Sequence, residues 1–167
     1  MVFRSAMDSE PGRSLIVWTI RFSVMLYAWS LFTCIKCQRR KQSTPPSDLL
    51  IWSASWVFCL VHVVFAFHFE HHWSHTEALQ HTADVTASVT GLQWSIGLYV
   101  NYVFIAAWGW DVVQRWRNAA PTTSLAFHAI AAFMMLNATA VFGPAFWIPV
   151  VAIYATGTWL LGYRDIS

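Results

Sequence analysis

Long apolar runs, separated by short segments that hold the charged residues, are the feature that most constrains this 167-residue chain. Only 11% of the residues are charged and 57% are hydrophobic, whereas an ordinary soluble domain has about 25% charged residues. A water-soluble fold of this size needs a charged and polar exterior, which these residues cannot provide. The sequence therefore predicts an all-α, polytopic integral membrane protein.

Five apolar runs are predicted to be membrane-spanning helices, since a helix needs about 20 residues to cross the hydrocarbon core. Their approximate ranges are 15–33, 49–69, 89–110 (starting at Val89 or Leu92), 125–142 and 145–161. The last two require a tight hairpin, because only Gly143 and Pro144 separate them. The whole chain, 1–167, is expected to form a single transmembrane domain.

Lysine and arginine give the predicted orientation. With five spans, all the basic residues that follow a span fall on one side, which the positive-inside rule makes cytoplasmic. These residues are Lys36, Arg39, Arg40, Lys41, Arg115, Arg117 and Arg164. The connection between the second and third spans has no Lys or Arg, so it is expected outside, as is the N-terminus. A bacterial inner membrane is the expected location, and no nucleic-acid partner is expected.

Histidines are concentrated in one segment: six of the seven lie between His62 and His81. If the second span continued as one helix, steps of about 100° would place four imidazoles on one arc. Those four belong to His68, His71, His72 and His75. However, residues 74–77 (Ser-His-Thr-Glu) match a capping box, which predicts a new helix from Ser74 and a bent pocket at the membrane surface. Both geometries allow a site.

The histidine cluster predicts a transition-metal site at the outer face. Neutral imidazole is the commonest protein ligand for zinc, copper and iron, and spacings of three and four residues let neighbouring rings converge on one ion. Carboxylates among the imidazoles favour iron or zinc and leave copper open. Glu70 and Glu77 are the candidate proton acceptors of a catalytic site. The candidate ligands are His68, His71, His72, His75 and His81.

Two other interpretations of the cluster stay open. One is an interfacial girdle of hydrogen-bonded His, Trp and Phe side chains. The other is a pH sensor, in which imidazoles repel one another as they protonate below about pH 6.5. A haem is less expected than a bare metal ion, because His62 and His128 are predicted at different depths and axial ligands must lie level.

The run His68-Phe-Glu-His71-His72 resembles the H-x-x-H-H box of membrane fatty-acid desaturases and hydroxylases, whose several boxes hold two irons. The resemblance covers five residues and implies iron as a metal. That family has three boxes, facing the cytoplasm, on a much longer chain, whereas this sequence has one box, expected outside. A complete di-iron desaturase is therefore not predicted.

The sequence leaves two main functions open. The first is metal-assisted oxidation or hydrolysis of a lipid-soluble substrate. The second is a non-catalytic transmembrane subunit or scaffold, alone as a homo-oligomer or within a larger membrane complex. A transporter would need polar residues continuing across the bilayer, and the spans show no such path. Asp111 is interpreted as the end of the third span, and Cys34 and Cys37 as two cysteines at a helix end.

Overall fold

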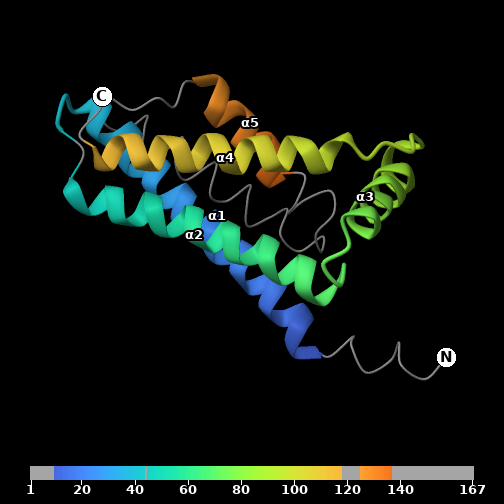
Figure 1. Cartoon of the computed structure of the whole chain (residues 1–167). Helices are drawn as coiled ribbons and strands as arrows, with labels where there is room; N and C mark the ends of the chain where they lie inside the picture. Colours follow the sequence, from blue (N-terminus) through green and yellow to red (C-terminus); the bar gives the residue numbers. More distant parts are fainter. Residues whose placement is uncertain (1–9, 44, 118–124, 137–167) are drawn as a thin grey trace.

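The computed structural model describes residues 10–43, 45–117 and 125–136, and all regular structure in these ranges is helical (Figure 1). In chain order the helices are α1 (Glu10–Arg39), α2 (Pro46–Phe69), α3 (His75–Thr90), α4 (Ile96–Trp116) and α5 (Leu125–Leu136). The prediction of an all-α fold is confirmed for these residues. The predicted span 145–161, and the part of span 125–142 beyond α5, lie outside the described residues.

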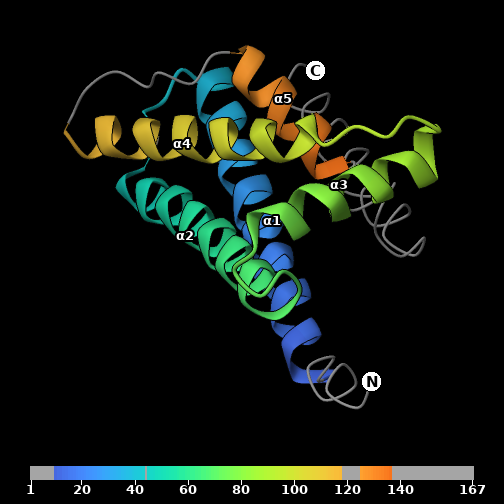
Figure 2. The same ribbon diagram turned by 45° about the vertical axis from the view of Figure 1, so that its right-hand side comes forward.

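Three helices are long and apolar enough to cross a membrane, and they correspond to the first three predicted spans. They are Pro11–Cys37 within α1, Pro46–Phe69 and Ile96–Trp116. With 30 residues, α1 is about 45 Å long, which exceeds a hydrocarbon core of about 30 Å. A helix of this length tilts or extends into the interface, and α1 is inclined to α4 (Figures 1 and 2).

The third long helix begins at Ile96 rather than at Val89 or Leu92, because α3 occupies the preceding segment. Gly91 ends α3 with a φ of 76°, and its N–H donates to the carbonyl of Ala87. A left-handed residue after the last turn is a common helix stop, and glycine adopts this conformation without strain. Val89 therefore belongs to α3, and Leu92 lies in the connection to α4.

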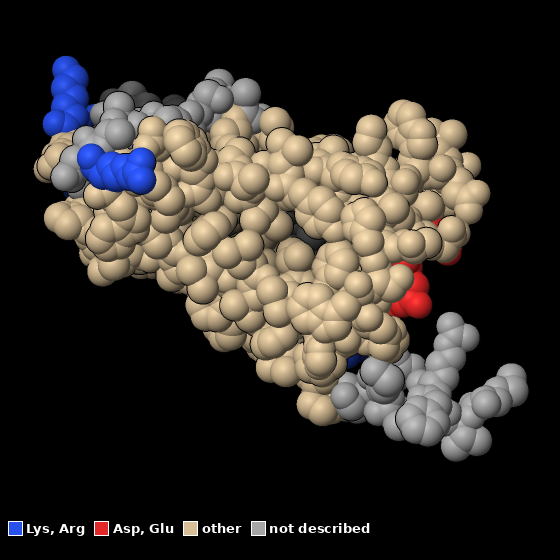
Figure 3. Space-filling model, viewed as in Figure 1, with Lys and Arg blue, Asp and Glu red and all other residues tan. Residues whose placement is uncertain are grey.

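The basic and histidine-rich segments lie at opposite ends of the bundle. The ends of α1 and α4 meet the start of α2, whereas α3 lies at the far end of α2 (Figures 1 and 2). We call the first the basic end, because it carries Lys36, Arg39, Arg40, Lys41, Arg115 and Arg117, and the second the histidine end. On the face drawn in Figure 3, most of the visible Lys and Arg atoms lie at one end, and the Asp and Glu atoms lie at the other.

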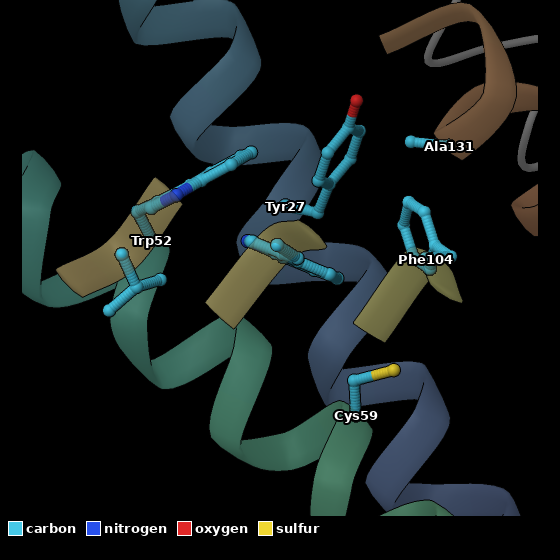
Figure 4. Close-up of a cluster of buried hydrophobic side chains, with 7 residues drawn as sticks. Tyr27, Trp52, Cys59, Phe104 and Ala131 are labelled. Atoms are coloured by element: carbon cyan, nitrogen blue, oxygen red, sulfur yellow. The ribbon is translucent and has the colours of Figure 1, made fainter. Parts of the chain in front are cut away.

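An aromatic core joins four helices (Figure 4). The rings of Trp52 on α2 and Trp108 on α4 have centroids 5.2 Å apart, and Tyr27 of α1 packs on Trp52 at 5.6 Å. Phe104 of α4 stacks on Phe127 of α5 at 5.2 Å. Helices in lipid have no hydrophobic driving force to associate. Close packing of this kind therefore has to hold them together.

Polar groups on the long helices pair with one another inside the bundle. The hydroxyls of Ser23 and Ser55 each donate to the other's carbonyl, at 2.8 and 2.7 Å, and so join α1 to α2. Asp111 is 1% exposed and accepts from Trp52 Nε1 at 3.0 Å and from Arg115 Nε at 2.6 Å. Asp111 therefore joins α4 to α2, instead of simply ending the span as the sequence suggested.

The tight packing of α2 against Gly109 of α4 predicts a large difference between two glycine substitutions on α4. In Gly109→Ala the new Cβ would lie 2.6 Å from Cζ2 of Trp56, whose Nε1 is held by the carbonyl of Ile105 at 3.0 Å. Such overpacking should cost about 1–3 kcal/mol. In Gly97→Ala the nearest atom, Thr82 Cγ2, lies 3.6 Å away, so a gain of up to about 1 kcal/mol is expected.

Unfolding of the purified protein in detergent micelles, by heat or by added SDS, measures both effects. Equal stability of the two variants would contradict the packing described for α2 and α4.

Candidate functional site

The histidine-rich connection is a tight reversal between α2, which ends at Phe69, and α3, which begins at His75. His72 and Trp73 have φ values of 48° and 61°, in the left-handed region that residues other than glycine rarely use. The hydroxyl of Ser74 accepts a hydrogen bond from the N–H of Glu77 at 3.2 Å and caps α3. The predicted helix start at Ser74 is confirmed, and the alternative of one helix continuing through these histidines is wrong.

The reversal brings two of the predicted ligands, His71 and His81, together. Their ring centroids lie 5.3 Å apart, with an angle of 58° between the planes. His71 is 9% exposed and packs edge-on against Phe67 at 5.6 Å, whereas His81 is exposed. Two imidazoles on one tetrahedral ion have ring centres about 5 Å apart, because each nitrogen lies about 2 Å from the ion. A separation of 5.3 Å is compatible with two ligands of one ion, and it also lies within the range of ordinary contacts between aromatic rings.

The surroundings of His71 favour its neutral form. Burial lowers the pKa of His71, and the nearby imidazoles of His81 and His72 lower it further, while Glu70 and Glu77 act in the opposite direction. A histidine must be neutral to bind a metal, so a lowered pKa reduces the competition from protons.

The second pair at this end consists of His72 and Glu77. The Nδ1 atom of His72 lies 3.5 Å from Oε2 of Glu77, and the two side chains are 48% and 58% exposed. The backbone N–H of Ser74, which a complete capping box would pair with Glu77, donates instead to the carbonyl of His71 at 2.6 Å. The Glu77 carboxylate is thus available to groups at the surface of the turn.

The remaining predicted ligands, His68 and His75, make aromatic contacts away from the pair. Nδ1 of His68 accepts from Nε1 of Trp73 at 3.2 Å. Nδ1 of His75 lies 3.3 Å from the hydroxyl of Tyr102, and the two rings stack with centroids 6.0 Å apart. These contacts are of the kind that the interfacial-girdle interpretation predicts. Among the described residues, no group of three or more His, Cys, Asp and Glu side chains is close enough to hold a metal ion.

His62 and His128 lie at different levels in the bundle. Nδ1 of His62 lies 2.9 Å from the carbonyl oxygen of Ile16. The ring of His128 instead packs against Trp52, at 6.0 Å, ten residues before His62 on the same helix α2, or about 15 Å along its axis. The predicted difference in depth is confirmed.

A group of ionisable side chains at the basic end was not indicated by the sequence analysis. Asp48 is 2% exposed, and its Oδ2 is hydrogen-bonded to the hydroxyl of Ser30 at 3.0 Å. Nearby lies the Asp111–Arg115 pair, with the guanidinium 4.7 Å above the Trp52 ring. The spacing of four residues between Asp111 and Arg115 is a helical ion-pair signal that was present in the sequence. No local pattern connects Asp48 with Ser30, because they lie on different helices.

The chain matches no protein-family model, no curated protein and no solved structure. The candidate site therefore has to be argued from the residues of this chain alone.

Removal of the Ser74 cap is expected to destabilise the first turn of α3 locally. Ser74→Ala should destabilise the first turn of α3 by about 1 kcal/mol, because the N–H of Glu77 loses its acceptor. Hydrogen exchange of the α3 first-turn amides should rise about fivefold on that basis. Ser88→Ala is the matched control, since the Ser88 hydroxyl only donates to the carbonyl of Val85 within the same helix. Equal exchange in the two variants would show that Ser74 does not fix the turn.

Proposed function

We propose that the chain is an integral membrane protein that binds one transition-metal ion at the histidine end, with His71 and His81 as its two imidazole ligands. The observation that carries the proposal is the separation of 5.3 Å between their rings, which suits two ligands of one tetrahedral ion. Their positions support it further, because the buried ring of His71 is fixed by Phe67 while His81 projects from the capped helix α3.

Glu77 is the proposed third ligand. It precedes His81 by four residues on α3, so the two side chains share a face of the helix, and its charge acts on His71. Because Glu77 is exposed, a rotation of its side chain is compatible with the fold. Two imidazoles and one carboxylate form a donor set used for zinc and for non-haem iron. His72, paired with Glu77 at 3.5 Å, is the alternative third ligand.

An apolar groove supports the proposal that a catalytic form of the site acts on a lipid-soluble substrate. It has a volume of about 530 Å³ and lies between α2 and α4, lined among others by Trp56, Leu60, Ile105 and Tyr102. Tyr102 lies 6.5 Å from the ring of Phe67, which in turn contacts His71.

In that proposal the metal ion would activate water or polarise the substrate, and Glu70 would accept a proton. The histidine end would face the outside of a bacterial inner membrane.

A non-catalytic membrane subunit or scaffold is the second candidate. It is favoured by the aromatic partners of His68 and His75, since these imidazoles already serve the packing of the turn and of α4. In that case the histidines would stabilise the interfacial end of the bundle, and a further copy or another subunit would cover the exposed helix faces.

Zinc binding by two variants, each lacking one histidine, tests the proposal. The purified protein should bind about one equivalent of Zn²⁺, and His81→Ala should weaken binding at least tenfold, because loss of one imidazole removes half of the pair. His68→Ala is the control variant, since His68 contacts Trp73 rather than His71, and it should bind Zn²⁺ as the unmodified protein does. Titration calorimetry with a metal analysis of the same sample measures both.

Less than a tenth of an equivalent of zinc, iron or copper in the unmodified protein would contradict the metal-binding function. Equal weakening by His81→Ala and His68→Ala would show that the ligands were assigned wrongly.

A further inference from the structure

A carboxylate oxygen of Asp48 is buried without a partner at the basic end. The side chain belongs to the first turn of α2 and is 2% exposed. Oδ2 lies 3.0 Å from the hydroxyl oxygen of Ser30 on α1, while Oδ1 has no hydrogen-bond partner among the described residues. A buried polar atom without a partner is rare in native proteins and calls for a ligand or a change of charge.

Among the described groups that interact with Asp48, the charges do not balance if both buried aspartates are ionised. Asp111 holds Arg115 through a 2.6 Å contact and accepts from Trp52 as well. The guanidinium of Arg115 is near enough to Asp48 to interact with its charge, but its Nε is directed to Asp111 and its plane covers the Trp52 ring. One guanidinium therefore faces two carboxylates in a region shielded from water, where an uncompensated charge is strongly disfavoured.

The titratable groups around this position come from every helix packed there. On α1, Cys34 lies one turn beyond Ser30 and is near enough to interact with Asp48. On α4 these groups are Asp111 and Arg115. On α5, His128 acts on both of them electrostatically and has its Nδ1 2.9 Å from the hydroxyl of Tyr27. Of the two described titratable groups that interact electrostatically with Asp48, Arg115 and Cys34, only Arg115 carries a positive charge at neutral pH.

We propose that Asp48 is a buried proton-binding site, occupied at neutral pH, at the basic end of the bundle. The proton removes the second negative charge, and it allows the carboxylic acid to donate through Oδ2 to the hydroxyl oxygen of Ser30 over the observed 3.0 Å. A hydroxyl both donates and accepts, so the contact suits either direction of the hydrogen bond. Oδ1 is then a neutral carbonyl oxygen, whose burial without a partner costs much less than that of a carboxylate.

A proton explains this site better than a metal cation does. Hard cations such as Ca²⁺ take six to eight oxygen ligands and Mg²⁺ about six, whereas Oδ1 of Asp48 is the one buried side-chain oxygen without a partner among the described residues. Release of the proton would place a second anion within range of Arg115, and so would compete with the Asp111–Arg115 ion pair within α4. Asp111 of that pair also accepts the hydrogen bond from Trp52 that joins α4 to α2. Proton exchange at Asp48 is thereby linked to helix packing, independently of the metal site.

Infrared spectroscopy of the full chain in lipid nanodiscs, in H₂O and in D₂O, tests the inference directly. A protonated carboxyl group absorbs apart from carboxylates and amides and shifts on deuteration. At pH 7 the unmodified protein should show one such band, and Asp48→Asn should lose it. Asp84→Asn is the matched control, because Asp84 is exposed on α3, at the other end of the bundle, and it should retain the band.

A second variant, Ser30→Ala, keeps the test decisive if Asp48→Asn does not fold. Loss of the Ser30 hydroxyl removes the hydrogen bond to Oδ2, so the acid band should shift in frequency. The proposal is overturned if the unmodified protein shows no acid band at pH 7, which is also the result expected for a bound cation. It is equally overturned if the band persists in Asp48→Asn or does not move in Ser30→Ala.

Discussion

The long helices need an apolar environment around their exposed faces, and the described part of the chain does not provide it. Only 28%, 17% and 22% of the most apolar windows of α1, α2 and α4 are buried inside the protein. Large side chains such as Trp29 and Trp110 are more than half exposed. A bilayer provides this surrounding but gives the helices no hydrophobic reason to associate. The Ser23–Ser55 hydrogen bonds and the contact of Asp111 with Trp52 therefore carry much of the specificity of helix packing.

The same constraint distributes the chemistry of the protein. Ionisable groups within the spans must be paired, as Asp111 is with Arg115 on the same helix and with Trp52 on α2. The turn between α2 and α3, in contrast, is free to present polar groups. The left-handed residues His72 and Trp73 reverse the chain so sharply that α3 returns His81 to the ring of His71. One end of the bundle thus offers imidazoles at a surface, and the other encloses carboxylates.

The sequence predicted the features that local patterns determine. Apolar run length predicted five spans, of which the first three correspond to helices long and apolar enough to cross a membrane. The Ser74 capping signal predicted the start of α3. Both signals act locally along the chain. The pairing of His71 with His81 could not be predicted, since the direction of α3 depends on backbone angles at two residues with no glycine to signal them. The burial of Asp48 depends on how α1 packs on α2, which no periodicity shows. The Asp111–Arg115 pair had a local signal, its four-residue spacing, that the interpretation of Asp111 as a span end overlooked.

X-ray absorption spectroscopy of the zinc-loaded full chain tests the proposed site most directly, because it identifies the atoms bound to the ion. The account predicts two imidazole ligands, with Zn–N distances of about 2.0–2.1 Å, and oxygen donors at the remaining positions. A spectrum with four imidazoles, with sulfur donors, or with no bound zinc after dialysis would contradict the assignment of His71 and His81 as the metal-binding pair.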